Sequence, residues 1–242
     1  MRLLGVVSYD GSLFVGWQIQ PNGRSVEEEI EKVLSKILNN KTKIYGSGRT
    51  DAKVHALGQT FHFDIDKENI DLGKFLYSIN SLLPEDIHII SLKKVDNDFH
   101  ARFSSKRKTY RYILNMGEYN PFERNYVFQF QRKLDINKIS EAAKLFIGEH
   151  NFKSFTAKEE DENNYIREIY SLNVSEDNNK LFFEITGNGF MRYMVRNIVG
   201  ALIEIGLGKI EQSYIETLLN KQTFCCQYRA KACGLYLIDV IY

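Results

Sequence analysis

Residues 46–59 read Gly46-Ser47-Gly48-Arg49-Thr50-Asp51-Ala52-Lys53-Val54-His55-Ala56-Leu57-Gly58-Gln59, and runs typical of β-strands flank them at Lys43–Tyr45 and Gln59–Ile65. The glycines Gly46 and Gly48 permit positive φ and let a ligand approach the backbone closely. Arg49 can bind a phosphate or a carboxylate through two parallel hydrogen bonds. Asp51 is a candidate nucleophile or general base if a cation holds it ionised. The same residue types also make ordinary polar turns, so the stretch alone leaves both interpretations open.

The segments around this stretch predict a compact α+β unit over residues 1–97. A capping box of Ser25 and Glu28 predicts the start of a helix, and an apolar stripe from Val26 to Leu38 continues it. Phe61, Phe63 and Ile65 alternate with polar residues, as in a strand with one buried face. The other predicted elements are strands at Arg2–Tyr9 and Ile87–Val95 and a helix at Asp71–Ser81. This order is typical of a ferredoxin-like (RRM-like) unit.

Residues 98–242 predict a second α+β half with a similar order of elements. We expect strands at Lys108–Asn115, Arg167–Val174, Leu181–Thr186 and Gly234–Ile241, with helices at Asp135–Ile147 and from Phe190 to Gly200. Gly148–Phe155 and the acidic residues 159–164 read as loops, and Glu176–Asn179 as a turn. Two such halves, with mainly antiparallel sheets, are expected to flank a central catalytic cleft, where substrates commonly bind.

Composition indicates an ordinary globular protein of the cytoplasm. The 242 residues are 43% hydrophobic and 26% charged, which is enough to bury a core, and no apolar run is long enough to span a bilayer. The N-terminus lacks the pattern of a signal peptide. Cys225, Cys226 and Cys233 are odd in number and have no nearby histidine, so we expect reduced thiols and no metal site.

Net charge is only +1, but the cations are unevenly distributed. Between Ala101 and Lys133 eight Lys and Arg residues face only Glu118 and Glu123, and four tyrosines are interleaved at positions 110, 112, 119 and 126. Cations bind phosphates and aromatic rings stack on unpaired bases, so this composition favours RNA. The alternative is a solvated strand edge protected by lysines.

The glycine-rich stretch resembles the signature loop of the TruA family of tRNA pseudouridine synthases. The resemblance runs from about Val7 to about Leu237 through five further segments, at Tyr9–Asn22, Phe99–Tyr112, Gly148–Phe155, Gly187–Gly200 and Gly234–Leu237. It implies that Asp51 is the catalytic nucleophile, that Tyr110 lies against the target base and that Arg196 faces the catalytic aspartate. Arg49 is then placed to clamp the RNA.

The resemblance further implies a homodimer that acts on tRNA at nucleotides 38, 39 and 40 of the anticodon arm. Pseudouridine formation needs no redox step, so neither cofactor nor metal is expected. Two departures are visible: Lys53 replaces a glycine, and Arg229-Ala230-Lys231-Ala232 replaces Thr-Ala-Pro-Ala. A paralogue that modifies another RNA and a non-catalytic RNA-binding protein on the same scaffold remain the alternatives. His55 and His100 are interpreted as structural histidines, and Glu204 is left unassigned.

Overall fold

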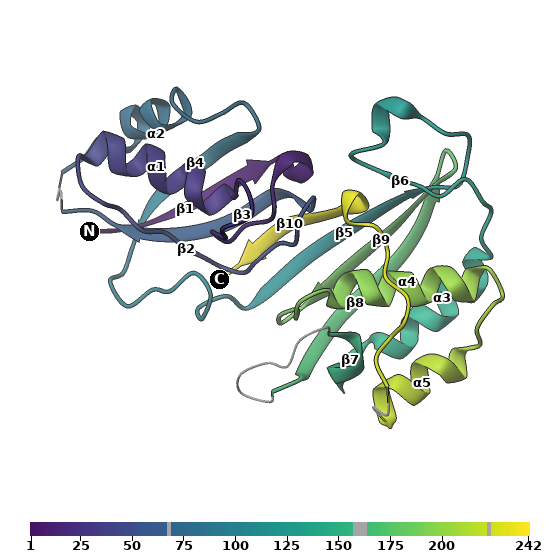
Figure 1. Cartoon of the computed structure of the whole chain (residues 1–242). Coiled ribbons are helices and arrows are strands. Elements are labelled where there is room, and N and C mark those ends of the chain that lie inside the picture. Colours follow the sequence, from purple (N-terminus) through teal and green to yellow (C-terminus); the bar gives the residue numbers. More distant parts are fainter. Residues whose placement is uncertain (67–68, 157–163, 222–223) are drawn as a thin grey trace. The chain divides into compact units, whose positions relative to one another are not determined.

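The computed structural model describes residues 1–66, 69–156, 164–221 and 224–242. The chain forms two compact units, each mixed α/β with a mainly antiparallel sheet (Figure 1). Unit 1 comprises Met1–Lys106 and Leu237–Tyr242, and unit 2 comprises Arg107–Tyr236. Within the described ranges no helix has both the length and the apolar character needed to cross a membrane.

Unit 1 is a sheet with helices on one face (Figure 1). The strands run in the order β4-β1-β3, and β2 pairs with β3 in an antiparallel hairpin. The end of β10 lies next to β3, where a Cβ on Gly58 would be only 2.4 Å from the carbonyl oxygen of Ile238. The elements are β1 (Arg2–Tyr9), η1 (Gly11–Leu13), α1 (Val26–Leu38), β2 (Tyr45–Gly46), β3 (His55–Asp64), α2 (Leu72–Asn80), β4 (Ile87–Val95) and β10 (Leu235–Ile241).

The predicted helix starts of unit 1 are confirmed. The Ser25 hydroxyl accepts a hydrogen bond from the amide of Glu28, and the Asp71 carboxylate accepts one from the amide of Lys74. Helix α1 ends at Asn39, which adopts the left-handed conformation common at helix C-termini. Its buried residues are Val26, Ile30, Val33 and Leu34, which follow the predicted stripe.

The prediction that β3 exposes one face is wrong. Thr60 and His62 are as buried as Phe61 and Phe63 on the opposite face. The Thr60 hydroxyl shares a 2.6 Å hydrogen bond with the hydroxyl of Tyr242, and His62 Nδ1 accepts one from the amide of Ala101. Residues distant in sequence therefore cover the polar face of this strand.

Unit 2 has the strand order β5-β9-β8-β7, with β6 parallel to β5. Helices α3 and α4 lie on one face of this sheet (Figure 1). The strands are β5 (Arg107–Asn115), β6 (Phe128–Gln129), β7 (Gly148–Asn151), β8 (Ile166–Asp177) and β9 (Lys180–Gly187). The helices are η2 (Pro121–Glu123), α3 (Ile136–Ala143), η3 (Lys144–Phe146), η4 (Lys153–Phe155), α4 (Met194–Gly206), α5 (Gln212–Asn220) and η5 (Ala232–Gly234).

Several elements of unit 2 differ from the predictions. Helix α4 begins only at Met194, because Tyr193 before it has a φ of 65°. Strand β7 lies in a stretch predicted as a loop, and α5 was not predicted. The β8–β9 turn is tighter than expected and consists of Asn178 and Asn179, both at positive φ. Of the predicted acidic loop, residues 159–163 lie outside the described residues.

Candidate active site

The backbone of Asp51 is held in unit 1 by the segment that precedes α1. Gly16 forms an isolated β-bridge with Asp51, and the amide of Trp17 donates to the carbonyl of Thr50 over 3.1 Å. On the other side, the amide of Val54 donates to the carbonyl of Asp51 over 3.2 Å and closes a tight turn. The half-buried Asp51 side chain therefore projects from a backbone that is fixed on both sides.

Buried polar side chains hold the same loop in place through hydrogen bonds. The hydroxyls of Tyr9 and Thr50 share a hydrogen bond of 2.8 Å. Ser47 donates to Gln59 Oε1 over 2.7 Å, and Gln59 Nε2 donates to the carbonyl of Gly48 over 2.9 Å. A buried network whose members are paired makes a loop rigid, since any displacement leaves a polar group without a partner.

The glycines of the loop act differently from the prediction. Gly46 does not adopt a positive φ. Gly46 is required because the indole of Trp17 lies against it, and a Cβ there would be 2.6 Å from the indole nitrogen. The residue with positive φ is Lys53, at 65°, where the resembling family has glycine. The lysine thus keeps the glycine-type turn and adds an exposed cation two residues from Asp51.

Arg49 is exposed on the same loop. Its charge acts on Glu27 of α1, whose carboxylate accepts a 2.9 Å hydrogen bond from the amide of Ile19. Burial raises the pKa of Glu27, while the Ile19 amide and the charge of Arg49 oppose that rise. The Glu27 carboxylate therefore connects the exposed loop that follows Trp17 to α1, and it lies close enough to Arg49 to interact with its charge.

The histidines that looked suited to acid–base chemistry have structural contacts. His55 is buried, and its Nδ1 accepts a hydrogen bond from the amide of Gly11 and lies 3.2 Å from the Asp10 carboxylate. His100 Nδ1 accepts a hydrogen bond from the amide of Arg102. Burial, then the charges of Arg2 and Arg102, lower the pKa of His100. Both rings thus serve to fix the backbone of their loops.

Tyr110 lies in the middle of β5 in unit 2. It is 8% exposed, and the edge of its ring meets Phe190 with ring centroids 5.2 Å apart. Tyr112, on the same face of the strand, is fully buried and donates from its hydroxyl to the carbonyl of Lys231. Burial raises the pKa of Tyr112 well above its usual value. Tyr112 is therefore an anchor for the segment before β10, and Tyr110 is the more accessible ring of the pair.

Arg196 lies in the first turn of α4 in the same unit. Its Nε donates to the carbonyl of Ala230 over 2.9 Å, and its guanidinium lies 5.5 Å from the ring centroid of Tyr193. The two cations that depart from the family pattern are also placed against aromatic rings. Arg229 lies 3.9 Å from the centroid of Tyr193, and Lys231 lies 5.1 Å from that of Phe128. Sequence reasoning did not predict these stacking partners.

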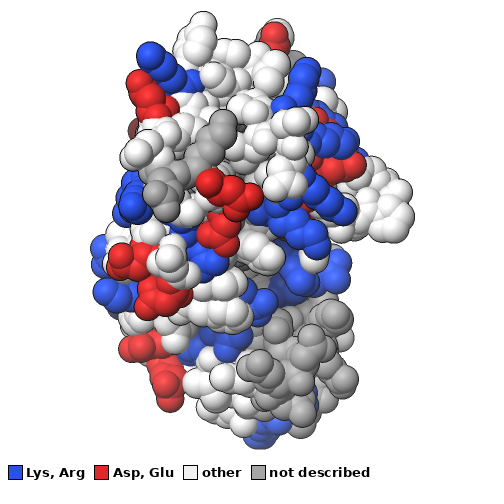
Figure 2. Space-filling model, turned by 90° about the vertical axis from the view of Figure 1, so that its left-hand side faces the viewer, with Lys and Arg blue, Asp and Glu red and all other residues white. Residues whose placement is uncertain are grey.

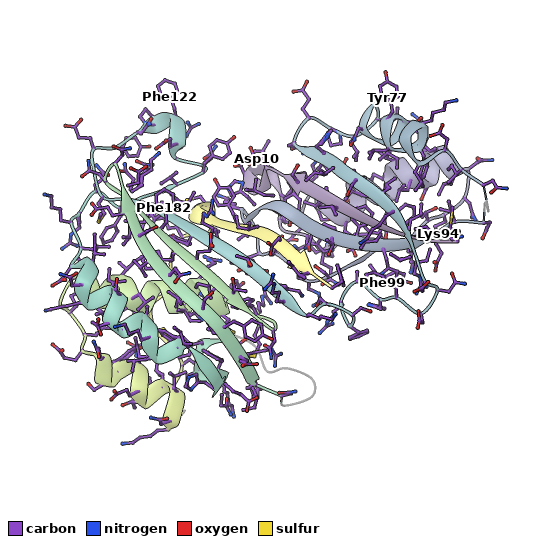
Figure 3. All side chains as sticks on the ribbon, turned by 180° about the vertical axis from the view of Figure 1, so that it is seen from behind. Asp10, Tyr77, Lys94, Phe99, Phe122 and Phe182 are labelled. Carbon is purple, nitrogen blue, oxygen red and sulfur yellow. The ribbon has the colours of Figure 1, made fainter. Side chains whose placement is uncertain are left out.

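The basic and tyrosine-rich segment has several distinct environments. On the face that Figure 2 presents, Lys and Arg side chains lie in several areas, with Asp and Glu side chains among them. Lys106 and Arg107 are exposed, whereas Arg111 forms an ion pair of 2.7 Å with Glu184 on β9. Tyr119 and Tyr126 are about half exposed, unlike Tyr110. Phe122, between them, is 87% exposed at the tip of its loop (Figure 3).

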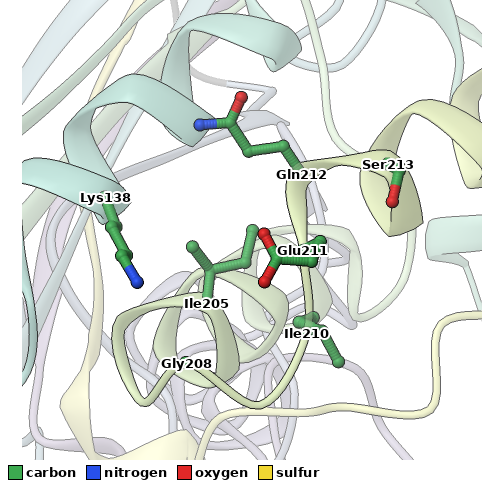
Figure 4. Close-up of a pocket in the computed structure, with 7 residues that line it drawn as sticks. All are labelled: Lys138, Ile205, Gly208, Ile210, Glu211, Gln212 and Ser213. Carbon is green, nitrogen blue, oxygen red and sulfur yellow. The ribbon is translucent and has the colours of Figure 1, made fainter.

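A hollow of about 400 Å³ lies elsewhere in unit 2, where α3 faces the turn between α4 and α5 (Figure 4). Its lining contains Lys138, Glu211, Gln212 and Ser213 beside Ile205, Gly208 and Ile210. None of the residues predicted to act in catalysis lines it.

The comparisons with known proteins show the family. The family model described as tRNA pseudouridine synthase matches residues 6–104 and 142–242. Proteins named tRNA pseudouridine synthase A are similar over the whole chain: 44% identical in Streptococcus uberis, 41% in Bacillus licheniformis and 40% in Mycoplasma genitalium, each with 98–99% of its own length covered. Among solved structures, a chain of a Cbf5-Nop10-Gar1 complex covers 83% of this chain and 54% of its own length at 16% identity. Its TM-score of 0.32 is too low to carry an argument. The chain belongs to the tRNA pseudouridine synthase family.

Proposed function

We propose that this pseudouridine synthase converts uridine to pseudouridine at nucleotides 38, 39 and 40 of the tRNA anticodon stem-loop, with Asp51 as the nucleophile. The observation that carries the proposal is the setting of Asp51. Asp51 is half-buried on a turn whose backbone carbonyls accept hydrogen bonds from the amides of Trp17 and Val54. The buried polar side chains that support this turn are hydrogen-bonded to one another. A preorganised carboxylate of this kind suits attack on a sugar carbon.

The reaction requires that the bond from C1′ of the ribose to N1 of the uracil breaks and that a bond from C1′ to C5 forms. The proton at C5 then leaves and N1 takes up a proton, so the substrate and the product have the same atomic composition. Asp51 either attacks C1′ or removes a proton from the sugar on the way to a glycal, and both routes need the ionised carboxylate. The family resemblance assigns Arg196 as the cation that faces this carboxylate, and a nearby guanidinium favours the charged form.

The target base must leave its stack, which costs a few kcal/mol and is offset by stacking inside the enzyme. We assign the stacking to Tyr110, because its ring is held edge-on by Phe190 in a fixed orientation on β5. Arg49 is assigned to the RNA backbone, because its guanidinium is exposed on the loop of Asp51.

We further propose two ferredoxin-like halves, residues 1–97 and 98–242, that flank a central catalytic cleft. In support, unit 1 has the element order β1-α1-β2-β3-α2-β4 and the strand order β4-β1-β3-β2, which are those of a ferredoxin-like unit. Unit 2 contains the comparable order β5-α3-β8-β9-α4. A homodimer in the cytoplasm is proposed from the resemblance alone.

The test uses tRNA that carries 5-tritiated uridine, because the isomerisation releases the tritium to water. The purified chain should release it, and nucleotide-resolution mapping should place pseudouridine at positions 38, 39 and 40. A matched tRNA with cytidine at these three positions should release no tritium. Release from the matched control, or from another class of RNA only, would favour the paralogue; no release from any RNA would favour the non-catalytic binding protein.

A further inference from the structure

Three arginines surround one tyrosine at the start of α4. The guanidinium carbons of Arg229, Arg192 and Arg196 lie 3.9, 4.8 and 5.5 Å from the centroid of the Tyr193 ring. Arg192 also donates from Nη2 to the hydroxyl of the same tyrosine over 2.9 Å. We name Arg192, Tyr193 and Arg229 the arginine–tyrosine cluster. Arg196 borders it.

The cluster carries positive charge that no acidic residue within the described ranges neutralises by an ion pair. Arg192 and Arg229 are exposed, and neither forms an ion pair with any residue that the structure describes. Two guanidiniums held on one ring repel each other, although solvent weakens that repulsion. The ring quadrupole offsets part of it, and the amino end of α4 adds partial positive charge in the same place. The local field thus favours an anion.

The cluster is held in place by buried contacts. Arg229 Nε donates to Asn197 Oδ1 over 3.0 Å, and the buried Asn197 donates from Nδ2 to the carbonyl of Phe155. The segment around Arg229 packs directly on α4, since a Cβ on Gly200 would be 2.7 Å from the carbonyl of Tyr228. Tyr193, the residue before α4, adopts a φ of 65°, which is unfavourable for an aromatic residue. Little conformational entropy remains to be lost when a ligand binds.

We propose that the arginine–tyrosine cluster binds a backbone phosphate of the substrate RNA, outside the reacting nucleotide. This inference rests on the proposed function, which supplies an RNA as the ligand. Guanidiniums match the geometry of phosphate oxygens and are the side chains most suited to them.

The test measures the affinity of unmodified tRNA by filter binding at several salt concentrations. The variants are Arg192→Gln, Arg229→Gln and their combination, because glutamine removes the charge and retains a donor that can face Asn197 or Tyr193. Each lost phosphate contact should flatten the slope of log K against log salt by about 0.7–0.9. The matched control is Lys138→Gln, an exposed cation at the hollow of Figure 4, which should keep the wild-type slope.

Arg229→Lys separates charge from packing: it should keep the wild-type slope, because the ammonium still binds phosphate. A slope as flat as that of Arg229→Gln would show that lost packing causes the effect, and would overturn the proposal. A wild-type slope in the double variant would do the same. The melting temperature with and without inorganic phosphate shows whether the cluster binds the free anion instead. If phosphate stabilises only the wild type while the salt slopes for tRNA are equal in all variants, the ligand is free phosphate and not RNA, and the proposal is overturned. Tritium release by the wild type, measured in parallel, reports on the proposed function separately.

Discussion

Arg196 and Ala230 hold each other by two reciprocal hydrogen bonds in unit 2. Arg196 Nε donates to the carbonyl of Ala230 over 2.9 Å, and the amide of Ala230 donates to the carbonyl of Arg196 over 3.0 Å. The direction of the guanidinium is therefore set by the segment before β10 as well as by the helix that carries it. The guanidinium is planar, so the hydrogen bond from Nε also fixes the plane of the two terminal nitrogens, which suits recognition of a carboxylate.

Arg196→Lys should lower the single-turnover rate at saturating tRNA by roughly tenfold or more, because a lysine has no separate Nε–H to bond Ala230 while a planar pair of donors faces the carboxylate. The loss of a hydrogen bond to a charged group is worth about 1.5–3 kcal/mol, and 1.36 kcal/mol corresponds to tenfold in rate. Rapid-quench measurement of tritium release gives the rate. Ala230→Gly is the matched control, since it keeps both backbone groups, and equal rates in the two variants would mean that Arg196 has no role in orientation.

Tyr110 offers a test of base stacking that separates the ring from the hydroxyl. Tyr110→Phe should bind tRNA normally, since the ring and its contact with Phe190 remain. It should lose turnover if the hydroxyl takes part in proton removal from C5. Tyr110→Leu should lose turnover and also about 1–3 kcal/mol of binding, the usual value of one stacked base.

The control for Tyr110 is Tyr77→Leu, because Tyr77 is 76% exposed on the outer side of α2 (Figure 3). Affinity is measured by filter binding, and turnover at saturating tRNA by tritium release. Normal turnover of Tyr110→Leu at saturation would identify Tyr110 as a core residue only.

The fold of unit 1 could be predicted largely from local patterns. The capping residues Ser25 and Asp71 and the periodic apolar residues marked both helices and all main strands. Helix α5 was missed although Ile215, Leu218 and Leu219 follow helical spacing, because Glu211 before it makes no capping bond, unlike the aspartate before α2. The late start of α4 could not be predicted, since nothing in a sequence indicates a tyrosine at positive φ.

In the candidate site, too, the residues of one local motif could be predicted, whereas residues brought together by tertiary structure could not. Arg49 and Asp51 share one loop, so a single motif identified both. The arginine–tyrosine cluster joins α4 to a segment far along the chain, and only tertiary structure brings those residues together. The role of Gly46 was also beyond prediction, because it depends on where the Trp17 ring packs.

Gly46→Ala should destabilise unit 1, because the added methyl group would overlap the buried Trp17 indole. Overpacking of this kind typically lowers the free energy of unfolding by about 1–3 kcal/mol. Urea denaturation followed by tryptophan fluorescence measures the effect. At Gly189 the nearest atoms to an added Cβ are 3.8 Å away on the flexible side chain of Arg167, so Gly189→Ala should be close to wild type. Equal stability of the two variants would contradict the close packing of Trp17 on the loop.

A lower pH should reduce the stability of unit 1, because His62 then binds a proton more readily in the unfolded chain. Burial, followed by the charges of His100 and Arg2, lowers the pKa of His62 from 6.5 to about 4. Below pH 6.5 the unfolded chain therefore binds this proton more readily than the folded chain does. The free energy of unfolding should fall as the pH drops from about 6.5 to about 4. Above pH 6.5 the titration of His62 should not change the free energy of unfolding.

The comparison for His62 is His62→Asn, whose side-chain oxygen can accept the hydrogen bond from the amide of Ala101 that Nδ1 accepts now. Urea denaturation at a series of pH values gives the difference between the two proteins, in which the titration of other groups cancels. The stability of the wild type should fall more steeply across the window. Parallel curves would show that His62 titrates at its usual pKa.

The central claim is that the Asp51 carboxylate performs the isomerisation, and Asp51→Asn tests it most directly. Asparagine keeps the size and shape of the side chain but is not a nucleophile, and loss of a negative charge does not repel phosphate. The variant should bind tRNA about as tightly as the wild type and release no tritium above background from 5-tritiated uridine in tRNA. Appreciable tritium release by Asp51→Asn, at any tRNA concentration, would contradict the claim and remove Asp51 from the mechanism.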